Sequence, residues 1–170
     1  MNTEALNTEA AQIKSVTEVV VEYARRWEEL EPARLMELWT MAPDVAYIAV
    51  ELDDVLVGSD AIHSHLARTR SRLTSVSVDL PRLWVRLVAP TIAIAVFVTR
   101  WELRRVETST VSETHTRSTA VLRLREGQWR FIHYMEEPYY VEPGETEFSN
   151  FLDDIASPFR PPMPSSSEAS

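Results

Sequence analysis

The chain has 170 residues, of which 45% are hydrophobic and 25% charged, and its formal net charge is −9. This length and composition are typical of one soluble globular domain with a core of its own. The negative charge argues against a nucleic-acid-binding surface, and the lack of cysteine excludes disulfides, thiolate metal sites and thiol nucleophiles.

The amino-terminal residues carry neither the basic segment nor the apolar segment of a secretion signal. Residues 1–8 are predicted to be frayed. The longest apolar run, Ile92–Val98, is far too short to span a bilayer. We therefore expect a cytoplasmic protein without a membrane segment.

Three helices are predicted in the first half of the chain. Apolar residues recur at three- and four-residue spacing from Ile13 to Leu30, which is typical of a helix with one buried stripe. Pro32 suits the first position of a second helix, Pro32–Trp39, because its missing N–H has no helical partner there anyway. A third helix is expected from Ser59 or Asp60 to about Ser71. Two short strands are expected between the second and third helices, at Val45–Val50 and Val55–Val57.

Four long antiparallel strands are predicted in the second half. The first, Val76–Leu87, contains Pro81, which implies an edge, a bulge or a bend. The second, Thr91–Glu102, is apolar on both of its faces, so we expect the helices to cover one face and a second copy of the chain to cover the other. Gly127 supplies the positive φ that a two-residue hairpin before the last strand requires.

Helices grouped ahead of a strand meander predict an α+β fold. We expect a cone-shaped, curved, mixed but mainly antiparallel sheet wrapped around the three amino-terminal helices, with a ligand cavity between them. The predicted boundaries are a frayed end at 1–8, the domain at 9–140, a docking extension at 141–157 and a disordered tail at 158–170. Within the extension, Phe148–Ile155 has four apolar residues at helical spacing.

Several short motifs within residues 12–138 resemble one family. They are Trp39 with Pro43-Asp44, Gly58-Ser-Asp-Ala-Ile62, Thr119-Ala-Val-Leu and Gly127-Gln-Trp-Arg-Phe-Ile-His133. This set resembles the SnoaL-like branch of the nuclear transport factor 2-like superfamily, which implies a cystatin-like α+β fold. Members of that superfamily include polyketide cyclases, scytalone dehydratase, ketosteroid isomerases and the non-catalytic association domain of calcium/calmodulin-dependent kinase II.

The resemblance to scytalone dehydratase implies two catalytic residues. Counted back from the hairpin, His115 matches a catalytic histidine of that enzyme, and Tyr47 matches a tyrosine that polarises the substrate carbonyl. A histidine can remove a proton next to a carbonyl, and a tyrosine hydroxyl can hydrogen-bond the resulting enolate. The sequence departs from this pattern because Thr91–Glu102 lacks the second histidine of that enzyme. The alternative for His115 is an exposed position near the end of the sheet.

The remaining candidates are predicted to line the cavity. Tyr134 and Glu136 lie on the strand parity opposite His133 and point into the cavity unless a bulge exchanges the faces. The resemblance to the association domain also implies a charged residue at the position of Glu136. Other predicted ligand-binding residues are Arg100 with Val98 on its strand parity, and His65 beside Ile62. Each has a structural alternative, which is snorkelling for Arg100 and core-edge packing for His65.

Two functions remain open from the sequence. The first is a cofactor-free dehydratase, isomerase or cyclase acting on a small carbonyl-bearing or aromatic compound. The alternative is a non-catalytic ligand-binding or oligomerisation module. No cofactor-binding fingerprint occurs, and His63 and His65 are two residues apart on a helix, which argues against a metal site. The expected partners are a small apolar or aromatic ligand and a second copy of the chain, with neither nucleic acid nor a membrane.

Overall fold

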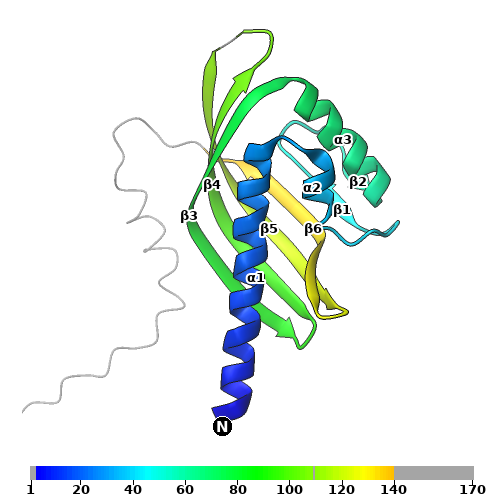
Figure 1. Cartoon of the computed structure of the whole chain (residues 1–170), viewed down its shortest axis with the longest axis vertical. Coiled ribbons are helices and arrows are strands. Elements are labelled where there is room, and N and C mark those ends of the chain that lie inside the picture. Colours follow the sequence, from blue (N-terminus) through cyan, green and yellow to red (C-terminus); the bar gives the residue numbers. More distant parts are fainter. Residues whose placement is uncertain (1–2, 109, 140–170) are drawn as a thin grey trace, which may run out of the picture. The chain divides into compact units, whose positions relative to one another are not determined.

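The computed structural model describes residues 3–108 and 110–139 (Figure 1). The predicted extension at 141–157, with Phe148–Ile155, and the tail at 158–170 lie outside the described residues. The elements, in chain order, are α1 (Thr3–Glu29), α2 (Pro32–Met36), β1 (Ala46–Ile48), β2 (Leu56–Val57), α3 (Ser59–Ser71), β3 (Leu73–Ala89), β4 (Ile92–Arg105), β5 (Val111–Arg125) and β6 (Gln128–Pro138).

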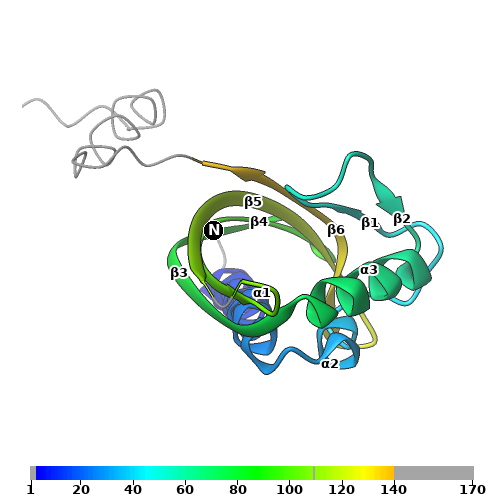
Figure 2. The ribbon, with the colours of Figure 1, turned by 90° about the horizontal axis from the view of Figure 1, so that it is seen from above.

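The strands form one six-stranded sheet in the order β2-β1-β6-β5-β4-β3. All neighbouring strands are antiparallel except β1 and β6, which run parallel. The sheet curls strongly and α1 lies against its concave side, while α2 and α3 lie nearer β1 and β6 (Figure 2). The predicted α+β fold, a curved and mainly antiparallel sheet with amino-terminal helices, is therefore confirmed.

Helix α1 begins at Thr3, so residues 3–8, which were predicted to be frayed, are helical instead. This segment contains helix-forming Glu, Ala and Leu and neither Gly nor Pro, so the helix continues beyond its buried stripe. Among the described helices, none combines the length and the hydropathy that crossing a bilayer needs.

Helix α2 ends at Met36, earlier than predicted, because the chain turns to pair with β6. The backbone N–H of Phe131 donates to the carbonyl of Leu38 over 2.8 Å, and the N–H of Thr40 donates to the carbonyl of Phe131 over 2.9 Å. Trp39 thereby becomes a bridge residue beside Phe131. These backbone bonds take the place of the last helical turn.

The core lies between α1 and the concave face of the sheet. One stripe of α1 is buried, and it consists of Val16, Val20, Tyr23 and Trp27. Opposite it, Ala93, Ala95 and Phe97 of β4 are buried, and the two small side chains leave room for the helix to approach. The helices therefore cover the face of β4 that carries Ala93, Ala95 and Phe97, and the face that carries Val96 and Val98 is turned away from α1.

Two local irregularities lie where the sequence predicts them. The β3–β4 register shifts between Asp79 and Arg82, around Pro81, and β3 is also an edge strand of the sheet. At the β5–β6 turn, Glu126 and Gly127 have φ values of 53° and 76°, so both central residues of the hairpin are left-handed.

The convex face of the sheet carries apolar side chains that this chain leaves partly uncovered. Trp84, Val96 and Met135 are 54%, 41% and 40% exposed. The register aligns Trp84 with Val96, Val96 with Thr119 and Thr119 with Met135, so they form one row across four strands. We refer to these four residues as the outer row.

Candidate functional site

A bulge in β6 determines which of its side chains face the concave side of the sheet. Leu122 pairs with Phe131 but Val121 pairs with His133, so Ile132 is an extra residue on β6. Before the bulge, Trp129 and Phe131 are buried, and after it the buried residue is Tyr134. Glu136, two residues further on, therefore shares the concave side with Tyr134.

The carboxyl group of Glu136 accepts hydrogen bonds from two neighbouring strands. The Tyr134 hydroxyl donates to Glu136 Oε2 over 2.6 Å, and Thr116 Oγ1 donates to the same oxygen over 3.4 Å. Behind them, Trp101 Nε1 donates to Thr116 Oγ1 over 3.1 Å, and Ser118 Oγ lies 3.1 Å from the Tyr134 hydroxyl. These hydrogen bonds therefore converge on Oε2 of Glu136.

Burial raises the pKa of Glu136 from its usual value of 4.5 to about 7. The hydrogen bond from Tyr134 opposes this shift, whereas the negative charge of Glu51 adds to it. Burial also raises the pKa of Tyr47 and of Tyr134 well above 10, which keeps both hydroxyls protonated as donors. Glu136 is therefore poised to gain or lose a proton near neutral pH.

A second acid–base pair lies beside this group. His65 on α3 is only 5% exposed, and its Nε2 is 2.9 Å from Glu51 Oε1. Burial is the largest single effect on the pKa of Glu51 and would raise it, but the hydrogen bond from His65, a backbone hydrogen bond and the charge interaction with His65 together lower that pKa below its usual value. The pKa of Glu136 is thus raised and that of Glu51 lowered, so near neutral pH Glu51 stays ionised, whereas Glu136 can both take up and release a proton.

Three buried donors have no hydrogen-bond acceptor among the described residues: the hydroxyl of Tyr23 and the indole N–H groups of Trp27 and Trp39. Those of Tyr23 and Trp27 lie nearest to the residues around Glu136. The Tyr23 ring packs 5.4 Å from that of Tyr134, and the Trp27 ring packs 5.5 Å from that of Trp101. The Tyr23 hydroxyl also interacts, in looser geometry, with the polar groups of Trp27, Tyr47 and Tyr134. Because buried donors are nearly always satisfied in native proteins, a ligand or an ordered water would complete the bonding of both donors.

We define the Glu136 cluster as the residues just described: Tyr23, Trp27, Tyr47, Glu51, His65, Trp101, Thr116, Ser118, Tyr134 and Glu136. Among the residues that the structure describes, no Arg or Lys takes part in its hydrogen bonds. Within the described part of the chain, no group of three His, Asp or Glu side chains is placed to hold a metal ion.

The sequence-family model of the SnoaL-like domain matches residues 16–136 of the chain. The chain belongs to the SnoaL-like family. A search of curated proteins found no match. The match covers every residue of the Glu136 cluster, so the cluster lies wholly within the SnoaL-like domain.

Solved structures share the SnoaL-like fold at low sequence identity. A nuclear transport factor 2-like protein from Salmonella enterica has a TM-score of 0.72 at 15% identity, covering 81% of this chain and 97% of that one. A candidate scytalone dehydratase from Novosphingobium aromaticivorans has a TM-score of 0.71 at 16% identity, covering 84% and 99%. A hexachlorocyclohexane dehydrochlorinase from Novosphingobium barchaimii has a TM-score of 0.65 at 14% identity, covering 82% and 94%. These likenesses establish the fold.

The site residues that were predicted from the sequence lie on opposite sides of the sheet. Tyr47, Ile62, His65 and Tyr134 are buried on the concave side. Val98, Arg100 and His115 lie on the convex side, since their neighbours Phe97, Thr99 and Thr116 point inward. His115 lies 3.6 Å from Glu113, and Arg100 pairs with Asp79 over 2.6 Å. The structure therefore does not bring His115 and Tyr47 together.

Sequence reasoning did not single out several members of the Glu136 cluster. Tyr23 and Trp27 looked like core residues because they lie on the apolar stripe of α1. Thr116 and Ser118 carried a usable signal, since they share a strand parity with the apolar Ala120 and Leu122. Polar residues at inward positions of a buried strand need partners, and that requirement points to a polar interior.

Proposed function

We propose that this SnoaL-like protein is a cofactor-independent catalyst of proton transfer at carbon, acting as a dehydratase or isomerase. The observation that carries the proposal is the place of the Glu136 carboxyl group, which is partly exposed on the concave side of the sheet and accepts hydrogen bonds from Tyr134 and Thr116. Its pKa, which burial raises to about 7, supports the same role. In its ionised form, Glu136 would remove a proton from the carbon next to a carbonyl group.

The developing negative charge on the substrate oxygen needs hydrogen-bond donors. The Tyr23 hydroxyl and the Trp27 indole N–H supply two that have no acceptor among the described residues. Donors aimed at a developing oxyanion in a water-poor interior are among the strongest contributors to catalysis. Because the polar members of the Glu136 cluster are acidic or neutral, we propose a neutral, aromatic or largely apolar carbonyl compound as the substrate.

A dehydration also needs a proton for the departing hydroxyl group. Glu136 would take the proton from carbon, the freed electron pair would form the double bond, and an acid would protonate the leaving oxygen so that water departs. We assign the acid role to His65, which Glu51 orients through the 2.9 Å contact. The candidate dehydratase and the dehydrochlorinase with the same fold support elimination chemistry by analogy alone.

A deuterium-exchange assay tests the proposal without knowledge of the full reaction. Neutral aromatic and polycyclic ketones are first screened for thermal stabilisation of the protein, and stabilising compounds are then incubated with it in deuterated buffer. We expect NMR to show accelerated loss of the proton next to the carbonyl. Stabilisation without any exchange would favour a non-catalytic ligand-binding module instead. We also propose that the protein is cytoplasmic.

We also propose a homodimer through the convex face of the sheet. The outer row presents three exposed apolar side chains, and the ion pairs Arg100–Asp79 and Arg117–Glu137 flank it with both signs of charge. A second copy could therefore cover this face without charge repulsion. A standard interface buries about 800 Å² on each partner, and such burial commonly outweighs the cost of association.

Val96→Asp is expected to convert the dimer to a monomer, because a carboxylate in the centre of the outer row would be buried without a partner. Light scattering at micromolar concentration measures the mass. Val106→Asp is the matched control, since Val106 is also exposed (52%) but lies outside the outer row. A wild-type protein that is already monomeric would contradict the proposal, as would an unchanged dimer in Val96→Asp.

A further inference from the structure

A hollow of about 510 Å³ lies between α1, the end of α2 and the start of β6, away from the Glu136 cluster. Its apolar lining includes Val19, Leu38 and Trp129, and its charged lining includes Arg26, Glu37 and Arg130. The volume falls within the range of small-molecule sites. None of these residues belongs to the Glu136 cluster.

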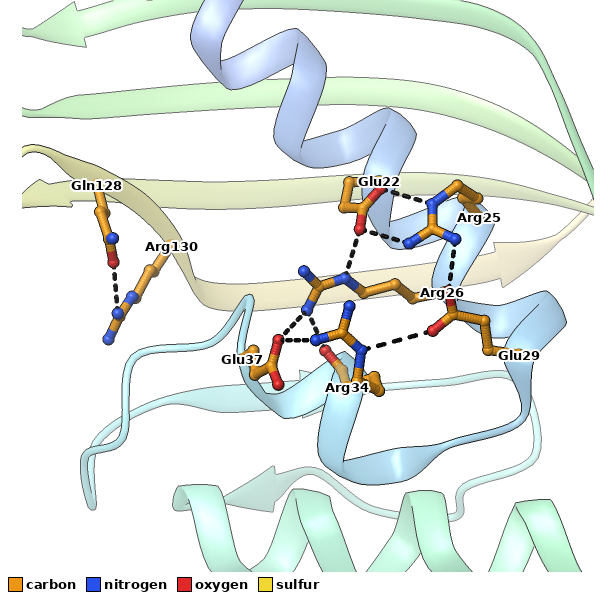
Figure 3. A network of polar contacts seen from close by, with 8 residues as sticks. All are labelled: Glu22, Arg25, Arg26, Glu29, Arg34, Glu37, Gln128 and Arg130. Carbon is orange, nitrogen blue, oxygen red and sulfur yellow. Dashed lines mark hydrogen bonds and ion pairs between the residues drawn. The ribbon is translucent and has the colours of Figure 1, made fainter.

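The polar network beside this hollow is balanced in charge apart from Arg130 (Figure 3). Three arginines, Arg25, Arg26 and Arg34, form ion pairs with three glutamates, Glu22, Glu29 and Glu37. Arg130 is the additional charge, and its recorded partner is the neutral side chain of Gln128 at 2.5 Å. The hollow therefore has one positive charge in excess, in a chain with a net charge of −9.

The guanidinium of Arg26 is nearly buried, with 12% of its side chain exposed. Its Nε donates to Glu22 over 2.7 Å, and its Nη1 donates to Glu37 over 2.9 Å and to the Arg34 carbonyl. Its Nη2 donates to no acceptor within residues 3–108 and 110–139, and it carries no dashed line in Figure 3. This guanidinium nitrogen is held in place by its neighbours, has no acceptor in the described part of the chain and lines the hollow, so it can donate to an anionic oxygen bound there.

Arg130 is also short of acceptors. Its Nη2 bonds to Gln128, while its Nε and Nη1 have no acceptor in the described part of the chain. Its direct cross-strand neighbour on β5 is Arg123, another cation, and like charges at such a position repel each other.

We propose that this hollow is a second binding site, for a small anion with an apolar body such as an aryl or alkyl carboxylate or a phosphate monoester. The anionic oxygens would accept from Arg26 Nη2 or from the free edge of Arg130, and the apolar body would lie on Val19, Leu38 and Trp129. The preference for an anion distinguishes this site from the Glu136 cluster, which favours a neutral ligand.

Isothermal titration calorimetry with 4-phenylbutyrate and with phenyl phosphate tests the proposal, with the neutral 4-phenylbutan-1-ol as the reference compound. We expect at least one anion to bind the full chain more tightly than the alcohol does. Arg130→Gln should weaken that binding by about tenfold or more, as expected for loss of a charge-assisted hydrogen bond. Arg123→Gln is the matched control, since Arg123 faces Arg130 across the sheet but does not line the hollow.

An NMR titration locates the binding. The indole N–H signal of Trp129, assigned through Trp129→Phe, should shift with the anion and shift less in Arg130→Gln. Three results would overturn the proposal: no binding of either anion at millimolar concentration, equal binding of the alcohol, or equal losses in Arg130→Gln and Arg123→Gln.

Discussion

Glu136→Gln is expected to lower the rate of proton exchange at carbon by about 10²–10⁴-fold, the usual contribution of general acid–base catalysis. The amide keeps an oxygen that Tyr134 and Thr116 can bond, so the fold should survive, but it cannot take a proton. In the wild type the rate should rise with pH through about 7, because the base must be ionised and burial holds its pKa there. The measurement is deuterium incorporation against pH for both proteins.

His115→Ala is the matched control for this experiment. His115 is also an ionisable residue, but it lies on the convex face of the sheet, so its loss should leave the exchange rate unchanged. If His115→Ala abolishes exchange while Glu136→Gln does not, the assignment of the base to Glu136 is refuted. Equal loss in both variants would count against it as well.

Glu136→Gln should also change how the stability of the protein depends on pH, and this effect can be measured without a substrate. The pKa of Glu136 is about 7 in the folded protein and 4.5 in the absence of burial, so the folded state binds this proton more tightly. The contribution of Glu136 to the free energy of unfolding is therefore greatest at low pH and declines as pH rises through about 7. We therefore compare the free energy of unfolding of wild type with that of Glu136→Gln by urea unfolding. The advantage of the wild type should be larger near pH 5 than near pH 8 by on the order of 2 kcal/mol, after allowance for the partial exposure of Glu136.

Phe131→Ala is expected to destabilise the protein by about 3–5 kcal/mol, the usual loss for removing a buried phenyl ring. Phe131 is completely buried, and its ring lies 5.1 Å from that of Tyr23 and 5.6 Å from that of Trp39. It therefore joins α1, the α2 exit and β6, and its loss should leave a cavity that all three border. Urea unfolding measures the change.

Gln128→Ala serves as the control for that loss. Gln128 is exposed on the same strand, so its truncation should change the free energy of unfolding by no more than about 0.5 kcal/mol. Comparable losses in the two variants would mean that β6 is not packed as described.

The fold was predictable from the sequence because its signals are local. The helical spacing of α1, Pro32, Pro81 and Gly127 each restrict the backbone within a few residues, and the structure places all of them as expected. The start of α1 was predicted too late, because an exposed helical turn of Glu and Ala carries no apolar stripe.

The candidate site was less predictable because it depends on register between distant strands. Tyr134 and Glu136 were proposed on the correct face, although Trp129 and Phe131, of opposite parity, turned out to share it. His115 and Tyr47 were paired by resemblance, and nothing in their local sequence shows that β5 presents His115 outward. The partners of Glu136 come from β4, β5, β6 and the loop after β1, and sequence spacing does not reveal such distances.

The bulge at Ile132 also affects how this chain is compared with others. Relatives of known structure share only about one residue in six with it. An alignment that misplaces one gap in β6 would set the carboxylate of Glu136 against a convex-face residue of the relative, while every other strand stayed matched. Catalytic roles carried over from such an alignment would then fall on the wrong residues. The last strand of this chain should therefore be aligned on the inward pair after the bulge, Tyr134 and Glu136, rather than on the motif that precedes it.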